Sequence, residues 1–141
     1  MGKFEFQMDP EFVRMLERMG DIDELAPKVL EGAAPILKAH VIAETDKHHE
    51  YSKDYELVKS IKSSKAFKNK YGWYLSVRPT GTDKSGVRNM EKMAHLEYGY
   101  YSHKNKIRIQ PIPILTKAIN DAKSEVERRM QQIFEEEVNG R

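Results

Sequence analysis

Two segments of the chain alternate apolar and polar residues, which is the period of a half-buried strand. The first is FEFQM at residues 4–8, and the second is YGWYLSVR, from Tyr71 to Arg78. We expect the second segment to pair with the residues that precede it. A shorter strand is predicted at KIRIQ, where Ile107 and Ile109 share one face.

Apolar residues three and four positions apart predict helices in both halves of the chain. We expect a short helix over residues 9–20, with Pro10 at its first position, and a longer helix over Leu25–Lys47. A kink or a break is expected between Gly32 and Pro35, because a proline inside a helix removes a backbone hydrogen bond.

In the second half, a helix is predicted from Met90 to Glu97, with Gly99 as its C-terminal cap. Pro113 then begins a final helix of roughly 25 residues. Its apolar stripe consists of Leu115, Ile119, Ala122, Val126, Met130, Ile133 and Phe134. Three glutamates at residues 135–137 lie at the end of the helix where negative charge is unfavourable. We expect this end to fray or to contact a basic group.

The segment from Tyr51 to Lys70 is ambiguous, because it fits both a short helix and a strand that begins at Ile61. The order of elements is then strand, helices, strands, helix, strand and long helix. This order predicts the α+β class, with a small, mainly antiparallel sheet packed with N-terminal helices and a long C-terminal helix. The length of 141 residues argues for a single domain, residues 1–141.

The amino-acid composition argues against several classes of protein. Charged residues make up 33% of the chain and the formal net charge is only +2, so the total charge does not predict a nucleic-acid-binding protein. The absence of cysteine excludes disulfides, thiol catalysis and zinc–thiolate sites. The N-terminal residues do not have the pattern of a signal peptide, and no apolar run approaches the roughly 20 residues of a membrane helix. We therefore expect a soluble protein that is made in a reducing cytoplasm.

Motifs of catalysis are missing from the sequence. His40, Glu44 and His48 have the spacing of one helix face, but the HExxH pattern of zinc hydrolases is absent and a solvated helix side explains them equally well. No serine lies in a Gly-x-Ser-x-Gly turn, and the glycine-rich loop PTGTDKSG lacks the spacing of a phosphate-binding loop. We expect neither an enzyme nor a metal or other cofactor.

A basic segment runs from Lys59 to Arg78 without any acidic residue. Its lysines are Lys59, Lys62, Lys65, Lys68 and Lys70, and the aromatic residues Phe67, Tyr71, Trp73 and Tyr74 are interleaved with them. Cations for phosphates and flat rings for bases are what a nucleic-acid groove requires. The same pattern also fits a strand pair whose lysines keep it soluble while its rings pack in the sheet. Contact with DNA and contact with an acidic protein both remain open.

The stretch from Ala94 to Ile119 resembles the small head–tail joining and tail-completion (neck) proteins of long-tailed bacteriophages. Members show a helix that ends in Glu-aromatic-Gly, a variable loop, a Pro-apolar-apolar motif and an alanine in the last helix. The corresponding positions here are Glu97, Tyr98, Gly99, Pro113, Ile114, Leu115 and Ala118. Tyr100 stands where members have a small hydroxyl residue, and HHEYSKDYE replaces their Pro-x-Asp-Thr-Gly turn.

The resemblance implies a structural virion protein of a phage or prophage, assembled in the bacterial cytoplasm without a cofactor or a catalytic site. Its copies would form a ring, expected to hold six subunits, at the head–tail junction or the tail end. Partners would be a phage head connector or tail tube protein, and passing DNA is a further candidate. The expected subunit contacts are Glu97, Tyr98, Gly99, Tyr100, Tyr101, His103 and Lys104. A solvated loop whose tyrosines cover the domain's own core is the alternative.

Overall fold

The structure is a computed structural model that describes residues 5–7, 10–11, 14, 22–51 and 55–140. Within the first of these ranges, strand β1 (Glu5–Gln7) confirms the central part of the strand expected at residues 4–8. The helix expected over residues 9–20 falls mostly outside the described residues. A short 3-10 turn, η1 (His49–Tyr51), precedes the gap at residues 52–54.

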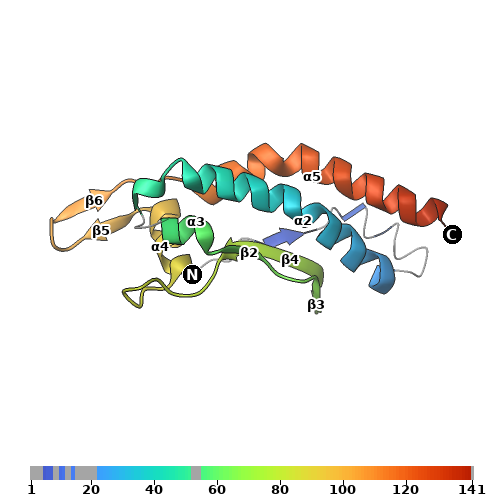
Figure 1. Cartoon of the computed structure of the whole chain (residues 1–141), viewed down its shortest axis with the longest axis horizontal. Helices are drawn as coiled ribbons and strands as arrows, with labels where there is room; N and C mark the ends of the chain where they lie inside the picture. Colours follow the sequence, from blue (N-terminus) through green and yellow to red (C-terminus); the bar gives the residue numbers. More distant parts are fainter. Residues whose placement is uncertain (1–4, 8–9, 12–13, 15–21, 52–54, 141) are drawn as a thin grey trace.

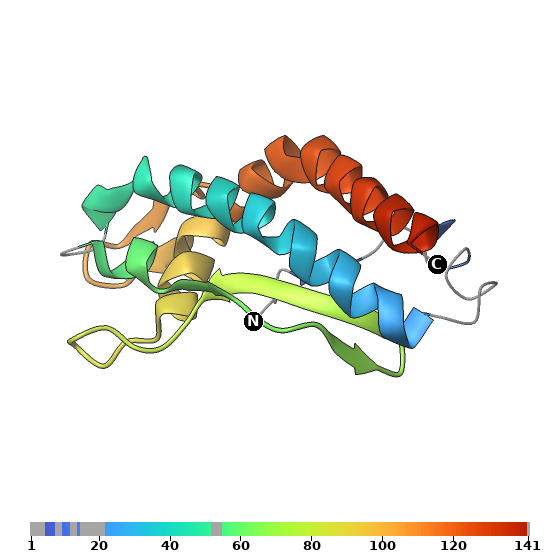
Figure 2. The same cartoon turned by 45° about the vertical axis from the view of Figure 1, so that its right-hand side comes forward.

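The body of the protein has three layers, and helix α2 (Ile22–Asp46) is the middle one. One side of α2 packs against the sheet, and the other packs along α5 (Ile114–Asn139), as Figures 1 and 2 show. The α2 residues that are buried between the two layers are Leu25, Ala26, Val29, Leu30, Ala33, Ala34, Leu37 and Val41. The core therefore extends along the length of α2.

Helix α2 is a single helix from Ile22 to Asp46, so the chain does not break between Gly32 and Pro35, and the kink expected there stays a prediction. Pro35 lies on the exposed side of the helix, where water can bind the backbone carbonyl that Pro35 cannot serve. The helix also begins three residues before the predicted Leu25, which moves Pro27 beyond the first turn.

The sheet is built around β4 (Gly72–Pro79). Strand β1 pairs antiparallel with one edge of β4, and the other edge pairs with β2 (Ile61–Ser63) and β3 (Phe67–Asn69). Helix α3 (Glu56–Lys59) directly precedes β2, so the ambiguous segment contains both predicted elements. The predicted pairing of the central strand with the preceding residues is confirmed.

Gly32 of α2 lies against Ile133 of α5. A Cβ atom at this position would lie 2.4 Å from Cδ1 of Ile133, so a larger residue would require the end of that flexible side chain to shift. The predicted α5 stripe is buried except at Ile119, which packs partly buried at the edge of the core. At the acidic end of α5, Glu137 forms an ion pair with Lys28 of α2 at 3.3 Å, which confirms the expected contact with a basic group.

Helix α4 (Asn89–Tyr98) leads away from the sheet, and Gly99 ends it as predicted. The chain continues into a separate two-stranded sheet formed by β5 (Tyr100–Ser102) and β6 (Ile107–Ile109), which extends from one end of the molecule in Figure 1. The fold is therefore α+β, as predicted from the order of elements. Within the described part of the chain, no helix is both long enough and apolar enough to span a membrane.

Candidate functional site

The β5–β6 hairpin and the adjoining end of α4 carry the largest group of exposed apolar side chains among the described residues. Tyr98 is 52% exposed, Tyr100 40%, Tyr101 49% and Ile107 52%. In an antiparallel pair, opposite residues share a face and neighbouring residues lie on alternate faces. The register places Tyr100 opposite Ile109 and Tyr101 opposite Arg108. Apolar surface is thus exposed on both faces of the hairpin.

Glu97 fixes the base of the hairpin to the start of α5. Its carboxylate accepts hydrogen bonds from the backbone N–H groups of Leu115, at 2.7 Å, and Thr116, at 2.9 Å. The hydroxyl of Thr116 donates a third bond to the same carboxylate, at 2.6 Å. The first N–H groups of a helix have no partner inside the helix, so a carboxylate at this end satisfies them and complements the helix dipole.

Gly99 sets the direction in which the hairpin leaves α4. Its φ of 71° and ψ of 175° lie in a region that is accessible almost only to glycine, rather than in the expected left-handed helical region. A Cβ here would lie 2.5 Å from the carbonyl oxygen of Ile109. The backbone N–H of Ile112 donates to the carbonyl of Leu96 at 2.6 Å, and Arg108 Nη2 donates to the carbonyl of Tyr98 at 3.2 Å. These contacts join the two ends of the hairpin at its base.

The hairpin is basic as well as aromatic. No acidic residue occurs from Tyr98 to Lys117, while the exposed tip contains Lys104 and Lys106. Ring contacts order its surface: His95 of α4 lies 5.1 Å from Tyr100, and His103 lies 5.0 Å from Tyr101, measured between ring centroids. The surface therefore offers aromatic rings beside positive charge.

The seven expected contact residues divide into two groups. The exposed positions are Tyr98, at the end of α4, and four residues of the hairpin: Tyr100, Tyr101, His103 and Lys104. Glu97 is 3% exposed with its carboxylate bound inside the chain, and Gly99 is packed against the backbone of the returning strand. Both residues therefore act within the fold of the single chain, and the exposed positions are the ones open to a partner. Ile107, which shares a face with Ile109 as predicted, was not among the expected contact residues although it is 52% exposed.

The five lysines of the basic segment do not form one surface. Lys68 faces α2, where its ammonium lies 2.8 Å from the Asp23 carboxylate, and the Trp73 indole donates to the same carboxylate at 3.0 Å. Lys70 lies over the ring of Tyr71, with 4.9 Å to the centroid. Lys59, Lys62 and Lys65 are exposed. The sheet register, which the sequence does not specify, separates the lysines in this way.

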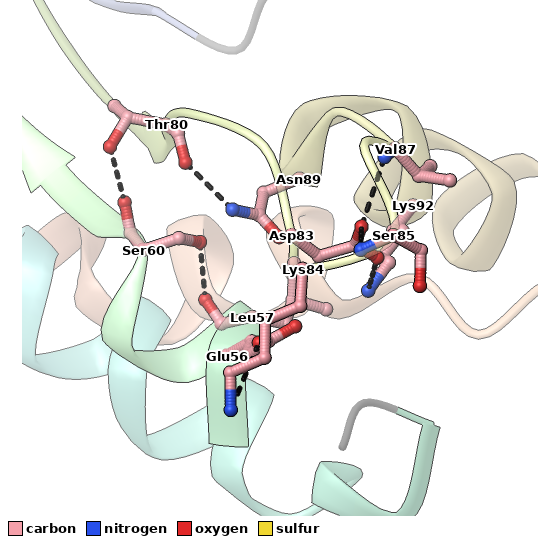
Figure 3. Close-up of polar contacts among 10 residues, drawn as sticks. All are labelled: Glu56, Leu57, Ser60, Thr80, Asp83, Lys84, Ser85, Val87, Asn89 and Lys92. Carbon is pink, nitrogen blue, oxygen red and sulfur yellow. Dashed lines mark hydrogen bonds and ion pairs between the residues drawn. The ribbon is translucent and has the colours of Figure 1, made fainter. Parts of the chain in front are cut away.

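The polar loop from Thr80 to Arg88 is a folded structure, shown in Figure 3. Asp83 organises it: its side chain accepts hydrogen bonds from the N–H groups of Ser85, at 2.8 Å, and Val87, at 2.9 Å, and forms an ion pair with Lys92. The Lys92 ammonium, and after it the Val87 N–H, lower the pKa of Asp83 below its usual 3.8.

An open pocket of about 370 Å³ lies between this loop and α3. It is lined by Glu56, Lys59, Ser60, Thr80, Thr82, Asp83, Lys84 and Asn89. The side-chain Nδ2 of Asn89 donates to the Thr80 carbonyl at 2.8 Å (Figure 3), while its buried Oδ1 has no hydrogen-bond partner among the described residues. Charges of both signs line this pocket, so its chemistry favours no single class of ligand.

His40, Glu44 and His48 are not arranged around a common point. His40 Nε2 lies 3.8 Å from the Glu125 carboxylate of α5, and the Glu44 carboxylate pairs with Lys47 at 3.0 Å. Among the residues that the structure describes, no group of three or more His, Cys, Asp or Glu side chains is placed to hold a metal ion.

Comparisons of the chain with protein-family models, with curated proteins and with solved structures find no match.

Proposed function

We propose that this protein is a structural assembly protein whose copies associate through the β5–β6 hairpin. The observation that carries the proposal is a two-stranded hairpin that exposes apolar side chains on both faces and is fixed to the body at its base. Tyrosines of this kind are typical of protein–protein contacts, because each offers a large rigid surface with a polar tip.

The low stability of an isolated two-stranded sheet supports the proposal that the hairpin binds a partner. Such a hairpin is at best marginally stable in water when nothing covers it. Its outer edges also present unpaired N–H and C=O groups that another chain can bind. Neighbouring subunits that cover Tyr101 on one face and Ile107 on the other remove apolar surface from water and stabilise the hairpin at the same time.

The resemblance to phage neck proteins supports the biological setting that we propose for this assembly. The resemblance includes Glu97, Gly99 and Leu115, which here join the hairpin to the rest of the fold. In the proposed setting, copies form a ring at the head–tail junction or tail end of a tailed phage or prophage, built in the bacterial cytoplasm. A closed ring requires contacts in which each copy uses two different surfaces. The same ring would contact a head connector or tail tube protein.

The experiment is to measure the solution mass by light scattering after size exclusion, over a wide range of protein concentration. We expect a discrete multimer, near six copies if the ring is of the resembled type. Tyr101→Ser and Ile107→Ser should shift the mass towards the monomer, because each removes exposed apolar surface from the hairpin.

Tyr71→Ser is the matched control. Tyr71 is 71% exposed, but it lies at the turn between β3 and β4 rather than on the hairpin. Its variant should keep the mass of the unmodified protein. A monomer at every concentration, or a multimer that is equally sensitive to all three substitutions, would contradict assembly through the hairpin.

A further inference from the structure

Strands β2 and β4 place two cations directly opposite each other. The antiparallel register pairs Lys62 with Arg78, so both side chains leave the same face of the sheet. This face is the one turned away from α2, because the flanking pair Ile61 and Pro79 is buried on the other side. Lys62 is exposed, and Arg78 is partly exposed.

Within residues 22–51 and 55–140 of the structure, no ion pair or hydrogen bond joins the Lys62 or the Arg78 side chain to another residue. This contrasts with Lys68 on the opposite face, whose ammonium is paired with Asp23. Like charges that are directly opposite on an antiparallel pair destabilise the sheet. An anion placed between Lys62 and Arg78 would remove that repulsion.

Aromatic rings continue the same face. Phe67 pairs with Tyr74 in the register, and their rings stack with centroids 6.0 Å apart. Tyr74 and Arg78 are four residues apart on β4, which corresponds to about 13 Å along a strand. Phe67 is 37% exposed, so part of its ring is accessible to a ligand.

The charge of this region differs from that of the whole chain. From Val58 to Thr82 the sequence contains six cations and no acid, which gives +6, whereas the whole chain has a net charge of +2. The remaining residues therefore sum to −4. Because Lys68 is paired with Asp23 on the opposite face, the positive field of this face rests on Lys62 and Arg78, and it attracts polyanions even when the total charge is nearly balanced.

We propose that the face carrying Lys62 and Arg78 binds the phosphodiester backbone of a nucleic acid, with a phosphate held between the two cations. A phosphate oxygen accepts hydrogen bonds from an ammonium and from a guanidinium alike, and charge-assisted bonds of this type are strong. The rings of Phe67 and Tyr74 lie where bases attached to the same backbone can stack. An acidic polypeptide would use the cations but has no groups that require the rings.

The test is fluorescence anisotropy with a labelled DNA of about 20 nucleotides, longer than the site of one small binding domain, in single-stranded and duplex form. Titrations at salt concentrations of roughly 50 to 200 mM give the salt dependence of affinity. We expect Lys62→Gln and Arg78→Gln each to weaken binding about tenfold and to reduce the salt slope by about one. Lys123→Gln, the same charge change on an exposed position of α5, is the control and should bind like the unmodified protein.

The Tm is a second measurement, and Lys62→Gln should raise it although the same substitution weakens DNA binding. This difference distinguishes a binding role of Lys62 from a structural one. Without DNA and at low salt, Lys62→Gln removes the repulsion from Arg78 and should raise the Tm by about 1–2 °C. Addition of DNA should raise the Tm of the unmodified protein more than that of the variant, because a ligand that binds the folded state stabilises it. A merely structural lysine would change Tm without changing DNA affinity.

Three results would overturn the proposal. One is the absence of DNA binding at the lowest salt, and another is equal weakening by all three substitutions. The third is competition by polyglutamate that matches that of unlabelled DNA, which would assign the face to an acidic protein. None of these results bears on the hairpin, since Tyr101 and Ile107 are unchanged in every variant.

Discussion

Glu97 and Gly99 show how two residues orient a whole hairpin. The Glu97 carboxylate is bound to the first N–H groups of α5, although Leu115 lies 18 positions later in the sequence. Gly99 admits the carbonyl of Ile109 to a distance that any side chain would block. Tyr98, between them, is 52% exposed. In the sequence Glu97-Tyr98-Gly99, the two outer residues therefore fix the base of the hairpin, and the middle residue is exposed.

At this scale we predict that Gly99→Ala lowers the free energy of unfolding by about 3 kcal/mol, because it adds backbone strain to a clash with a carbonyl oxygen. Urea unfolding measures the change. Gly81→Ala is the matched control: its φ of 69° is also positive, but nothing lies within 4 Å of the added Cβ. This control should lose only about 1 kcal/mol from strain. Equal losses in the two variants would show that the close approach of Ile109 contributes nothing.

Among the elements, the loop from Thr80 to Arg88 shows how one carboxylate can order a polar segment. Its glycines and charged residues suggest only a solvent-exposed connection when taken one by one. In the structure, Asp83 accepts two backbone N–H groups and pairs with Lys92 of the following helix, and its side chain is only 6% exposed. The loop is thereby attached to α4.

We predict that this attachment is sensitive to acid. Because the pKa of Asp83 is lowered in the folded protein, its contribution to stability is fully present above its usual pKa of 3.8. The contribution is lost as the pH falls through the lowered pKa. The Tm of Asp83→Asn should therefore lie below that of the unmodified protein at neutral pH, and the difference should shrink in acid.

Asp121→Asn provides the comparison for this pH series. Lys117 likewise lowers the pKa of Asp121, but both side chains of this pair are about half exposed to solvent. Solvent screening should make its effect on Tm smaller at neutral pH. A difference between Asp83→Asn and the unmodified protein that stays constant down to the acid transition would contradict the role given to the Asp83 charge.

At the scale of the whole molecule, the protein consists of a three-layer body and a hairpin that packs mainly on itself. The body contains nearly all of the buried apolar residues, whereas β5 and β6 contribute none to the core. The stability of the fold and the proposed assembly would therefore depend on different parts of the chain.

This division predicts that the hairpin can be shortened without unfolding the body. Tyr100 and Ile109 are paired, so replacing residues 101–108 with Asn-Gly joins them through a two-residue turn. The free energy of unfolding should change by about 1 kcal/mol or less, as for surface changes, while light scattering should show a monomer. An unfolded variant would mean that the hairpin belongs to the core, and a persisting multimer would place the subunit contact elsewhere.

The features that could be predicted from the sequence alone are those that depend on residues close together in the chain. The period of apolar residues placed the central strand, α4 and α5, and Gly99 and Pro113 marked their limits, because each of these signals depends on neighbours within a few residues. The α+β class followed from the order of these elements. Pro35 does not end the helix, since the cost of a proline depends on which side of α2 faces water.

Only the tertiary structure decided which residues are available for contact. Burial of Glu97 requires the start of α5 to lie beside the end of α4, and no local pattern specifies that distance. Lys62 and Lys68 look alike in the sequence, yet the register leaves Lys62 without an ion pair to the residues of 22–51 and 55–140 and brings Lys68 to Asp23. The physical reason is that side-chain availability depends on contacts between segments far apart in the chain, whereas periodicity reports only the face on which a residue lies within its own element.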